Sequence, residues 1–326
     1  MPNGRIVVST FILLLSIVCP RSAEAWNGTG HELVAGIAWD NMTPAARQKA
    51  IELLEAAPEN ACLLDLFPND ARPLEVRQRE FFMRAATWPD VIRPRGDNDS
   101  RRCTRFHQRD WHFIDHFWQG VSDGTGSRAP RDRTDIEIPD VNATERLGVF
   151  DDTVPCTGNG CPSAGRRAMQ LAWILHLVGD IHQPLHTAAR VTPNHPDGDR
   201  GGNSFPLAGD HPQLHSYWDN IVDTAVPRRA GEFGNQRTIV YLDRVIAMIV
   251  ADHPRASVED RIDPRHFDAW ALEGFETTKR SLYPRSLHIN EEPSDDYRDR
   301  AFEIASDAIA LGGYRLADLL NTILPQ

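Results

Sequence analysis

The stretch at residues 171–186, LAWILHLVGDIHQPLH, constrains the fold most strongly, because it places ionisable groups inside a run that otherwise reads as a buried helix. His176 and Asp180 are four residues apart, which puts both side chains on one helix face, about one turn apart. Burying such groups without partners costs free energy. A shared metal ion therefore explains the pair better than a core helix with a few hydrogen-bonded polar residues. Pro184 is expected to stop the helix, which leaves His186 on the exit loop, able to turn back toward the same site.

The N-terminal 25 residues have the pattern of a secretory signal peptide. A positive charge precedes a short apolar core at residues 6–18, and Ala-Glu-Ala at 23–25 is a small-x-small cleavage site. An uncleaved membrane anchor is less favoured, because the apolar run is short for a membrane span. Cleavage would make Trp26 the first mature residue and leave one domain at 26–326. We therefore predict a secreted or periplasmic protein without stable membrane association.

The mature chain is acidic. Losing Arg5, Arg21 and Glu24 with the signal leaves 33 basic and 45 acidic residues, a net charge of −12. This balance is poor for broad electrostatic capture of a polyanion. If the substrate is a nucleic acid, its recognition must be local and centred on metal.

Four cysteines remain in the mature chain, which in an exported protein suggests two disulfides. Cys156 and Cys161 flank a Thr-Gly-Asn-Gly turn, so we favour that local pair and a second pair of Cys62 with Cys103. Four cysteines allow three connectivities, and the sequence does not choose among them. A cysteine-rich zinc site is disfavoured, because no CxxC spacing occurs.

Helical periodicity dominates the rest of the chain. The expected helices are at 31–39, 44–57, 74–91, 142–150, 163–182, 214–224, 232–252, 265–283 and 297–322. Thr43 and Pro44 form a typical helix start. The expected irregular segments are loops at 93–104 and 120–140, an extended, partly buried segment at 106–118, and a long loop or poor hairpin at 187–212. Without a repeat, a linker or a strand-rich block, this pattern predicts a single, mostly helical all-α domain.

Further candidates for a site lie outside the central helix. They are Trp26 and His31 in WNGTGH, Asp90 and Arg93 in WPDVIR, His112 in WHFID, Asn203 in DRGGN, and His215 and Asp219 in LHSYWD. His215 and Asp219 repeat the four-residue spacing of the central pair. Nitrogen and carboxylate ligands without thiolate favour zinc over manganese or iron.

In this order, the motifs resemble those of the S-one/P-one family of zinc-dependent single-strand nucleases and 3′-nucleotidases. These are all-α trinuclear zinc enzymes that share a fold with bacterial zinc-dependent phospholipase C. The resemblance runs from Trp26 to YRLADLLN near the C-terminus. It implies a single helical domain with long loops around a trinuclear metal cleft.

The resemblance also implies which residues hold three zinc ions per chain. The first zinc would be held by Asp90, His112, His176 and Asp180. The second would be held by His186, His215 and Asp219. The third would be held by Trp26, through its free α-amino group and carbonyl oxygen, by His31, and by Asp180 as a bridge. A carboxylate can serve two metals because it has two oxygens, and the amine becomes a ligand only after the signal is cut.

For the substrate, the resemblance implies a base-binding role for Phe113 and Asp115 and a phosphate contact for Arg93. Phe113 as a plain core residue is an equally good reading. Asp199 and Asn203 are expected to hold the long loop, with Asn203 at the substrate. We interpret His182 as structural or as support for a ligand, and His107, His116, His195, His211, His253, His266 and His288 as surface or core residues.

The expected activity is hydrolysis of single-stranded DNA and RNA to 5′-phosphorylated products by metal-activated hydroxide, together with 3′-nucleotidase action on nucleotides. Arg93 and Asp180 would be its catalytic residues, and the enzyme is expected to be monomeric. A zinc-dependent phospholipase C is the alternative, although the lipases it would resemble carry Glu where this chain has Asp219. A non-catalytic, metal-stabilised binding protein is the second alternative, and it would be expected to have lost a ligand or Arg93.

Overall fold

The computed structural model describes residues 26–119, 130–234, 238–263 and 265–324. The predicted signal peptide at 1–25 and most of the first half of the expected loop at 120–140 lie outside these residues. The helices in the described part are α1 (Gly28–Asn41), α2 (Pro44–Glu55), α3 (Leu74–Ala85), α4 (Trp88–Val91), α5 (Ala143–Thr153), α6 (Ala164–Asp180), α7 (Leu214–Asp219), α8 (Ile221–Ala225), α9 (Thr238–Asp252), α10 (Phe267–Thr277) and α11 (Asp295–Ile323). The strands are β1 (His116–Gln119), β2 (Arg131–Asp132) and β3 (Ala188–Val191). The predicted all-α class is confirmed.

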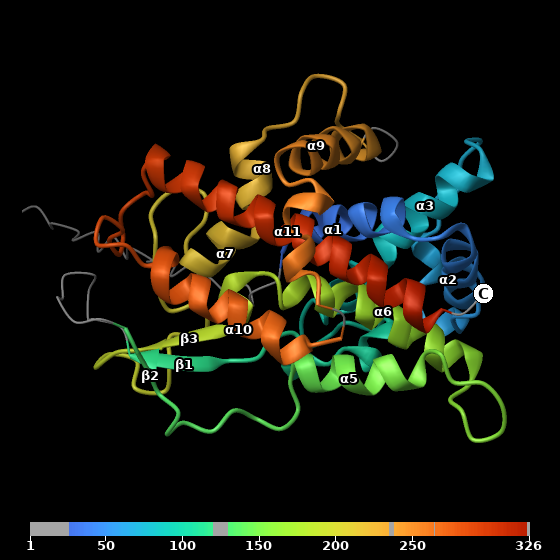
Figure 1. The fold of residues 1–326 in the computed structure, drawn as a ribbon, viewed down its shortest axis with the longest axis horizontal. Helices are drawn as coiled ribbons and strands as arrows, with labels where there is room; N and C mark the ends of the chain where they lie inside the picture. The colour runs from blue at the N-terminus through green and yellow to red at the C-terminus, as the bar shows by residue number, and fades with distance from the viewer. Residues whose placement is uncertain (1–25, 120–129, 235–237, 264, 325–326) are drawn as a thin grey trace, which may run out of the picture.

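Three helices that are far apart in sequence form the centre of the molecule. α11 packs along α1, and both contact α6, while α9 and α3 lie on the outer side of α1 and α5 lies against α6 (Figure 1). The N-terminal half of α6 is partly exposed, but every residue from Leu171 to Asp180 is buried. A helix that is buried on all sides must have its polar groups satisfied inside the protein. His176 and Asp180, both fully buried, therefore need partners from other elements.

Helix starts follow the sequence closely. Thr43 caps α2 by accepting a hydrogen bond from the Ala46 N–H, with Pro44 in the first turn, as predicted. Asn27 and Ser163 cap α1 and α6 in the same way. A short polar side chain before a helical run satisfies an N–H that the helix itself leaves open.

Two expected helices are each broken in two. The predicted 74–91 helix divides into α3 and α4, because the Thr87 hydroxyl bonds the Arg84 carbonyl and Pro89 disfavours helix before it. The predicted 214–224 helix divides at Asn220 into α7 and α8. Both breaks leave a backbone carbonyl free for a partner from another segment. The Ala86 carbonyl accepts from the His176 ring, and the Asp219 carbonyl accepts from the Asn27 N–H.

The end of the central helix also differs from the prediction. α6 ends at Asp180, before Pro184 can act, and Pro184 instead opens a 3-10 turn, η6 (Pro184–His186). The intervening turn is closed by hydrogen bonds from the His182 N–H to the Gly179 carbonyl and from the Gln183 N–H to the Asp180 carbonyl. This tight turn brings His186 back toward the centre of the fold.

A small sheet, which the sequence does not predict, lies beside α10. β1 pairs antiparallel with β2 and parallel with β3, with His116 opposite Ala188. The predicted extended segment at 106–118 is extended only at its end. The first residue of this segment, Phe106, is the last residue of a 3-10 turn, η3 (Arg102–Phe106). A second 3-10 turn, η4 (Arg109–Trp111), follows. The predicted 187–212 loop likewise begins as β3, because pairing between residues so far apart leaves little local signal.

The C-terminal third contains the three expected helices, α9, α10 and α11, with shifted bounds. α10 is continued by one π-helical turn to Leu282. Both favoured disulfides, Cys62–Cys103 and Cys156–Cys161, are present. None of the described helices is both long and apolar enough to cross a membrane.

Candidate metal centre

The buried pair on α6 is joined by side chains from two other segments. Asp90 on α4 and His112, directly after η4, face the pair from outside the helix. The His112 Nδ1 atom lies 2.9 Å from His176 Nε2, and the two nitrogens lie 4.0 Å and 3.9 Å from the Asp90 carboxylate oxygens. The four predicted ligands of the first metal therefore meet in one place.

The two oxygens of Asp180 face different partners. Oδ2 lies 3.2 Å from His112 Nδ1 and 3.2 Å from His176 Nε2. Oδ1 lies 3.4 Å from Nε2 of His31 on α1. One carboxylate thus stands between two groups of nitrogen donors, which is the arrangement that a bridging ligand requires.

A second group lies beside the first. His186, on η6, places its Nε2 atom 3.0 Å from Nε2 of His215 on α7. The Asp219 Oδ1 atom lies 3.7 Å from the same His215 nitrogen. Donor atoms of all three residues fall within 4.8 Å of one another, so these side chains could hold a metal ion.

Backbone carbonyls fix the ring orientation of three histidines. The Nδ1 atoms of His176, His186 and His215 each lie 2.7 Å from a carbonyl oxygen, of Ala86, His112 and Gly201 respectively. Each ring must therefore donate its Nδ1 proton, which leaves the Nε2 lone pair facing the group. Two such lone pairs, on His186 and His215, face each other across 3.0 Å. That contact is repulsive unless a cation lies between the nitrogens.

Several buried polar atoms at this site have no hydrogen-bond partner in the described structure. They are both ring nitrogens of His31, Nε2 of His112 and both carboxylate oxygens of Asp180. Unpaired buried polar atoms are rare in folded proteins, and each calls for a missing ion or water. The donor set of imidazole nitrogens and carboxylate oxygens suits zinc. The residues present therefore fit a metal group.

Burial shifts the titration of these side chains toward their neutral forms. It lowers the pKa of His31 and of His112 well below the usual range, and it raises the pKa of Asp180 to about 7. Neutral imidazole is the form of histidine that binds metals. Burial alone would lower the pKa of His176 as well, but the nearby Asp180 and Asp90 carboxylates outweigh it and raise that pKa.

Trp26, the predicted mature N-terminus, lies next to this site. Its side chain is fully buried, and its indole N–H has no partner among the described residues. The neighbouring Asn27 donates its backbone N–H to the Asp219 carbonyl and its side-chain amide to Asn220 and Asp223. These bonds tie the start of the mature chain to α7 and α8, which brings Trp26 to the same end of α1 as His31.

Two glycines permit the close approaches in the site. Gly201, at φ +59°, accepts a hydrogen bond from His215 Nδ1 at its carbonyl oxygen, and a Cβ there would lie 2.2 Å from the Leu185 carbonyl oxygen. Only glycine fits such a left-handed position without a clash. Gly179 on α6 faces α1, where a Cβ would lie 2.6 Å from His31 Nδ1. Through the Gly201 carbonyl, the DRGGN segment thus holds the ring of the candidate ligand His215 in place.

A cleft of about 600 Å³ opens over the two groups of ligands. Its walls include the predicted substrate residues Arg93, Phe113, Asp115 and Asn203, together with His112, His186 and His215. Arg93 also forms an ion pair with Asp90 at 3.1 Å. Burial, with the nearby Asp199 charge, raises the pKa of Asp115 to about 7. Four of the five residues that the sequence assigned to substrate or catalysis therefore line one cleft, and the fifth, Asp180, is fully buried.

Three residues differ from or extend the sequence prediction. His107, expected to be surface or core, lines the cleft beside His112. Gln183 was not singled out, yet its buried amide donates to Asp219 Oδ1 at 2.8 Å. In the sequence, the position of Gln183 between Asp180 and His186 is the signal that could have identified it. His182 contacts the Val178 carbonyl and Arg315, so it is structural.

Asp199 behaves as expected for a residue that holds the long loop. It is fully buried and accepts hydrogen bonds from the Arg190 and Gly202 N–H groups and from the Tyr283 hydroxyl. Asn203 bonds the Arg200 carbonyl at the edge of the cleft.

Comparisons with known proteins give a consistent picture. A family model described as S1/P1 Nuclease matches residues 26–325. Nuclease S1 of Aspergillus oryzae is 27% identical over 177 residues, which cover 51% of this chain and 58% of that protein. Endonuclease 2 of Arabidopsis thaliana is 23% identical over 330 residues, which cover 98% of each chain.

Proposed function

Because this chain belongs to the S1/P1 nuclease family, we propose that it is an exported zinc-dependent phosphodiesterase acting on single-stranded DNA and RNA. Its products would carry 5′-phosphates, and it would also remove the 3′-phosphate of nucleotides. One observation carries the proposal: both groups of potential metal ligands open on the cleft that Arg93, Phe113 and Asp115 line.

We propose three zinc ions per chain. Asp90, His112, His176 and Asp180 would hold the first, and His186, His215 and Asp219 would hold the second. Trp26, His31 and Asp180 would hold the third. The opposed oxygens of Asp180 support its bridging role, and the unpaired nitrogens of His31 support a ligand on that side.

Bound zinc supplies Lewis acidity and lowers the pKa of water from 15.7 to about 7. The chain itself then has to bind and orient a phosphodiester. Arg93, held toward the centre by its ion pair with Asp90, adds positive charge where negative charge develops on phosphorus. Phe113 would stack on an unpaired base, while Asp115 would hydrogen-bond the edge of that base and Asn203 would contact the substrate from the long loop. Duplexes are disfavoured because splaying out a base costs unpairing energy.

Two features support export and maturation. The family match begins at Trp26, directly after the expected cleavage site. The two disulfides are typical of an oxidising compartment. Because the proposed third zinc needs the free amine of Trp26, cutting the signal would complete the metal centre.

The test uses the mature protein, with its N-terminus verified by mass spectrometry. Zinc per chain is measured by elemental analysis, and hydrolysis is measured on single-stranded DNA, RNA, duplex DNA, a 3′-nucleotide and a phosphatidylcholine. We expect about three zinc ions and turnover of the first two polymers and the nucleotide, lost to a chelator.

A matched pair of variants tests the cleft. Arg93→Ala should lower kcat about 10²-fold on single-stranded DNA. Arg95→Ala removes an exposed arginine from the same loop that does not line the cleft, and it should have little effect. Preferential lipid hydrolysis would favour the phospholipase alternative, and a folded protein with one zinc or none would favour a binding protein.

A further inference from the structure

A second cavity, of about 640 Å³, lies between α5 and α6 on the other side of the segment that carries His112. Five aromatic side chains line it: Trp88, Phe106, Trp111, Phe150 and Trp173. Trp111 and Phe106 are half-buried, so their rings are in part accessible from outside. Its size suits a ligand as large as a nucleotide. Neither the metal centre nor the proposed reaction uses this cavity, which we call the aromatic cavity.

The aromatic rings form a rigid wall. Trp111 packs edge to face on Trp173 and on Phe150, with ring centroids 5.0 Å and 5.5 Å apart. Trp173 in turn contacts the ring of His112 at 5.1 Å. These contacts fix the Trp111 indole without covering it completely, which is what a stacking platform requires.

Two buried amide oxygens at this cavity have no hydrogen-bond partner. Oε1 of Gln170 on α6 and Oδ1 of Asn60 are both buried and unpaired, and both residues line the cavity. Gln170 is only 8% exposed, so it cannot turn out into solvent. A buried acceptor without a donor is destabilising. A ligand that offers N–H groups, such as the edge of a nucleobase, would satisfy it.

The aromatic cavity adjoins the metal cleft. Along residues 105–113 the side chains divide between the two hollows. Arg105, Phe106, Gln108 and Trp111 line the aromatic cavity, whereas His107, Arg109, His112 and Phe113 line the cleft. One short segment is thus the wall between them. A chain that crosses this wall could occupy both.

Arginines lie around the aromatic cavity. Arg105 and Arg166 are exposed, and Arg146 is half-buried, with its guanidinium 5.4 Å from the Trp111 ring centroid. Arg146 also forms an ion pair with Glu145, so the two other arginines carry most of the local positive charge. In a chain with net charge −11, such a grouping around aromatic rings fits an anionic ligand with flat, apolar parts.

We propose that the aromatic cavity is a second base-binding subsite, which takes an unpaired base of the same strand whose phosphodiester lies in the metal cleft. The base would lie against Trp111 with its edge at Gln170, while Arg105 and Arg166 would contact the flanking phosphates. The inference rests on the proposed nuclease function and deepens it, because it makes affinity depend on strand length.

The experiment measures that dependence on the zinc-loaded, mature enzyme. The kcat/KM for a single-stranded oligonucleotide of about 12 residues is divided by that for a dinucleotide, which fills only the metal cleft. We expect this ratio to fall about 10-fold in Trp111→Ala and about 3- to 10-fold in Arg105→Ala/Arg166→Ala and in Gln170→Leu. The loss should lie in KM rather than kcat.

Arg102→Ala is the matched control, because Arg102 is an exposed arginine on the same 3-10 turn as Arg105 and lines neither hollow. It should leave the ratio as it is in the wild type. If Trp111→Ala does not fold, the ratio measured for Arg105→Ala/Arg166→Ala, which replaces two exposed side chains, tests the subsite instead. An unchanged ratio in Arg105→Ala/Arg166→Ala and in Gln170→Leu would overturn the subsite.

A binding measurement separates this proposal from the proposed function. Fluorescence anisotropy follows a labelled phosphorothioate oligonucleotide of the same length on the zinc-loaded wild type and variants. If no substrate is hydrolysed but the arginine and Gln170 variants weaken binding, the nuclease proposal fails and the subsite stands. If hydrolysis is normal and neither the ratio nor binding changes, the subsite fails and the function stands.

Discussion

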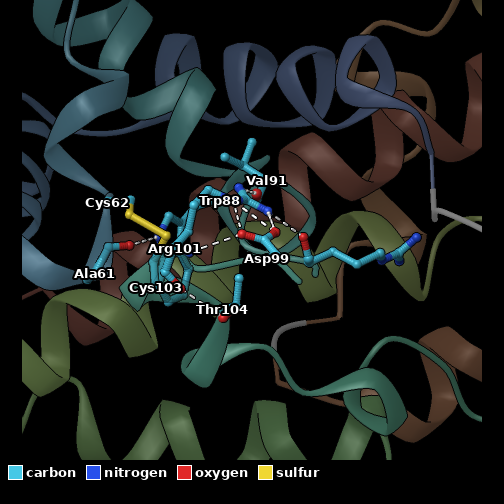
Figure 2. The surroundings of a disulfide bond; sticks show 9 residues. Ala61, Cys62, Trp88, Val91, Asp99, Arg101, Cys103 and Thr104 are labelled. Carbon is cyan, nitrogen blue, oxygen red and sulfur yellow. Dashed lines mark hydrogen bonds and ion pairs between the residues drawn. A yellow bond between two sulfur atoms is a disulfide. The ribbon is translucent and has the colours of Figure 1, made fainter. Parts of the chain in front are cut away.

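The metal centre and the loop at residues 94–103, which ends at the Cys62–Cys103 disulfide and which we call the disulfide loop, accommodate charged groups in opposite ways. Both hold charged groups that are at least partly buried: the Asp180 side chain is fully buried, and the Asp99 and Arg101 side chains are 8% and 27% exposed. In the disulfide loop, Arg101 donates to the Asp99 carboxylate and to the Val91 carbonyl (Figure 2). It also donates to the Arg93 carbonyl, so these polar groups are paired within the protein. In the metal centre, the Asp180 oxygens and the His31 nitrogens have no hydrogen-bond partner.

The disulfide loop thus has a structural role, whereas the metal centre has the features of a binding site. The disulfide loop is complete when the chain has folded, because its donors match its acceptors. The metal centre brings together acceptors and lone pairs, and only a cation makes that arrangement favourable. The two regions are also joined, since the Arg101 bond to the Arg93 carbonyl helps fix the backbone that carries Arg93 in the cleft.

Metal removal should give the largest contrast between the two regions. Extensive dialysis against a chelator should abolish hydrolysis and lower Tm by roughly 10 °C or more, because metal binding contributes directly to folding stability. Calorimetry with and without added zinc measures the effect. A Tm that is the same in both states would show that the ligand groups are satisfied without metal.

Asp180→Asn should disable the proposed first and third zinc sites, which share this carboxylate. We expect the zinc content to fall by about two ions and kcat/KM to fall at least about 10³-fold. Asp151→Asn is the matched control: Asp151 is also a buried aspartate, but it is paired with Arg265, which lies just before α10. Full zinc content in Asp180→Asn would contradict the bridging role.

Gln183→Leu should weaken the second group without removing a ligand. Loss of the hydrogen bond to Asp219 should lower activity or zinc affinity about 10- to 100-fold, as for other residues that orient metal ligands. Gln48→Leu, on the exposed face of α2, provides the comparison. Competition with a zinc indicator measures affinity, and an affinity equal to that of the wild type, with normal kcat, would reject the orienting role.

Removing the long-range disulfide should affect stability far more than chemistry. The Cys62–Cys103 bond spans 41 residues and Cys156–Cys161 only 5. Loop-closure entropy gives losses of about 4 and about 2 kcal/mol for Cys→Ser pairs at these positions. Urea unfolding measures both, and equal losses would mean that loop entropy does not govern these bonds.

The smallest effect is expected from Asp99→Asn, and it should depend on pH. Hydrogen bonds from Arg101 lower the pKa of Asp99 below its usual range. The carboxylate therefore contributes stability above its unfolded pKa of about 3.9 and loses that contribution as pH falls through the lowered folded pKa. The Tm difference between wild type and variant should be largest near pH 7 and shrink below about pH 4. A Tm difference that grows as the pH falls would contradict the stabilising role of the Asp99 carboxylate.

The sequence by itself determined the helical class and the main helix starts, and it pointed to the candidate metal ligands on α6 and α7. These follow from local rules: a polar cap before a helical run, and a four-residue spacing that places two side chains on one face. Such signals lie within a few residues of one another, so no tertiary information is needed to read them. The preference for the disulfide pair Cys156–Cys161 had the same local basis.

Only the tertiary structure decided where helices break and what the breaks serve. The division at Ala86 and Thr87 frees a carbonyl that sets the ring of His176, and the break at Asn220 frees one that binds the start of the mature chain. The role of Gln183, the small sheet and the aromatic cavity also depend on segments that are far apart in sequence. Their energies come from contacts that exist only after the chain has folded. Local patterns therefore left the sheet and the cavity unpredicted, and gave for Gln183 only its position between two candidate ligands.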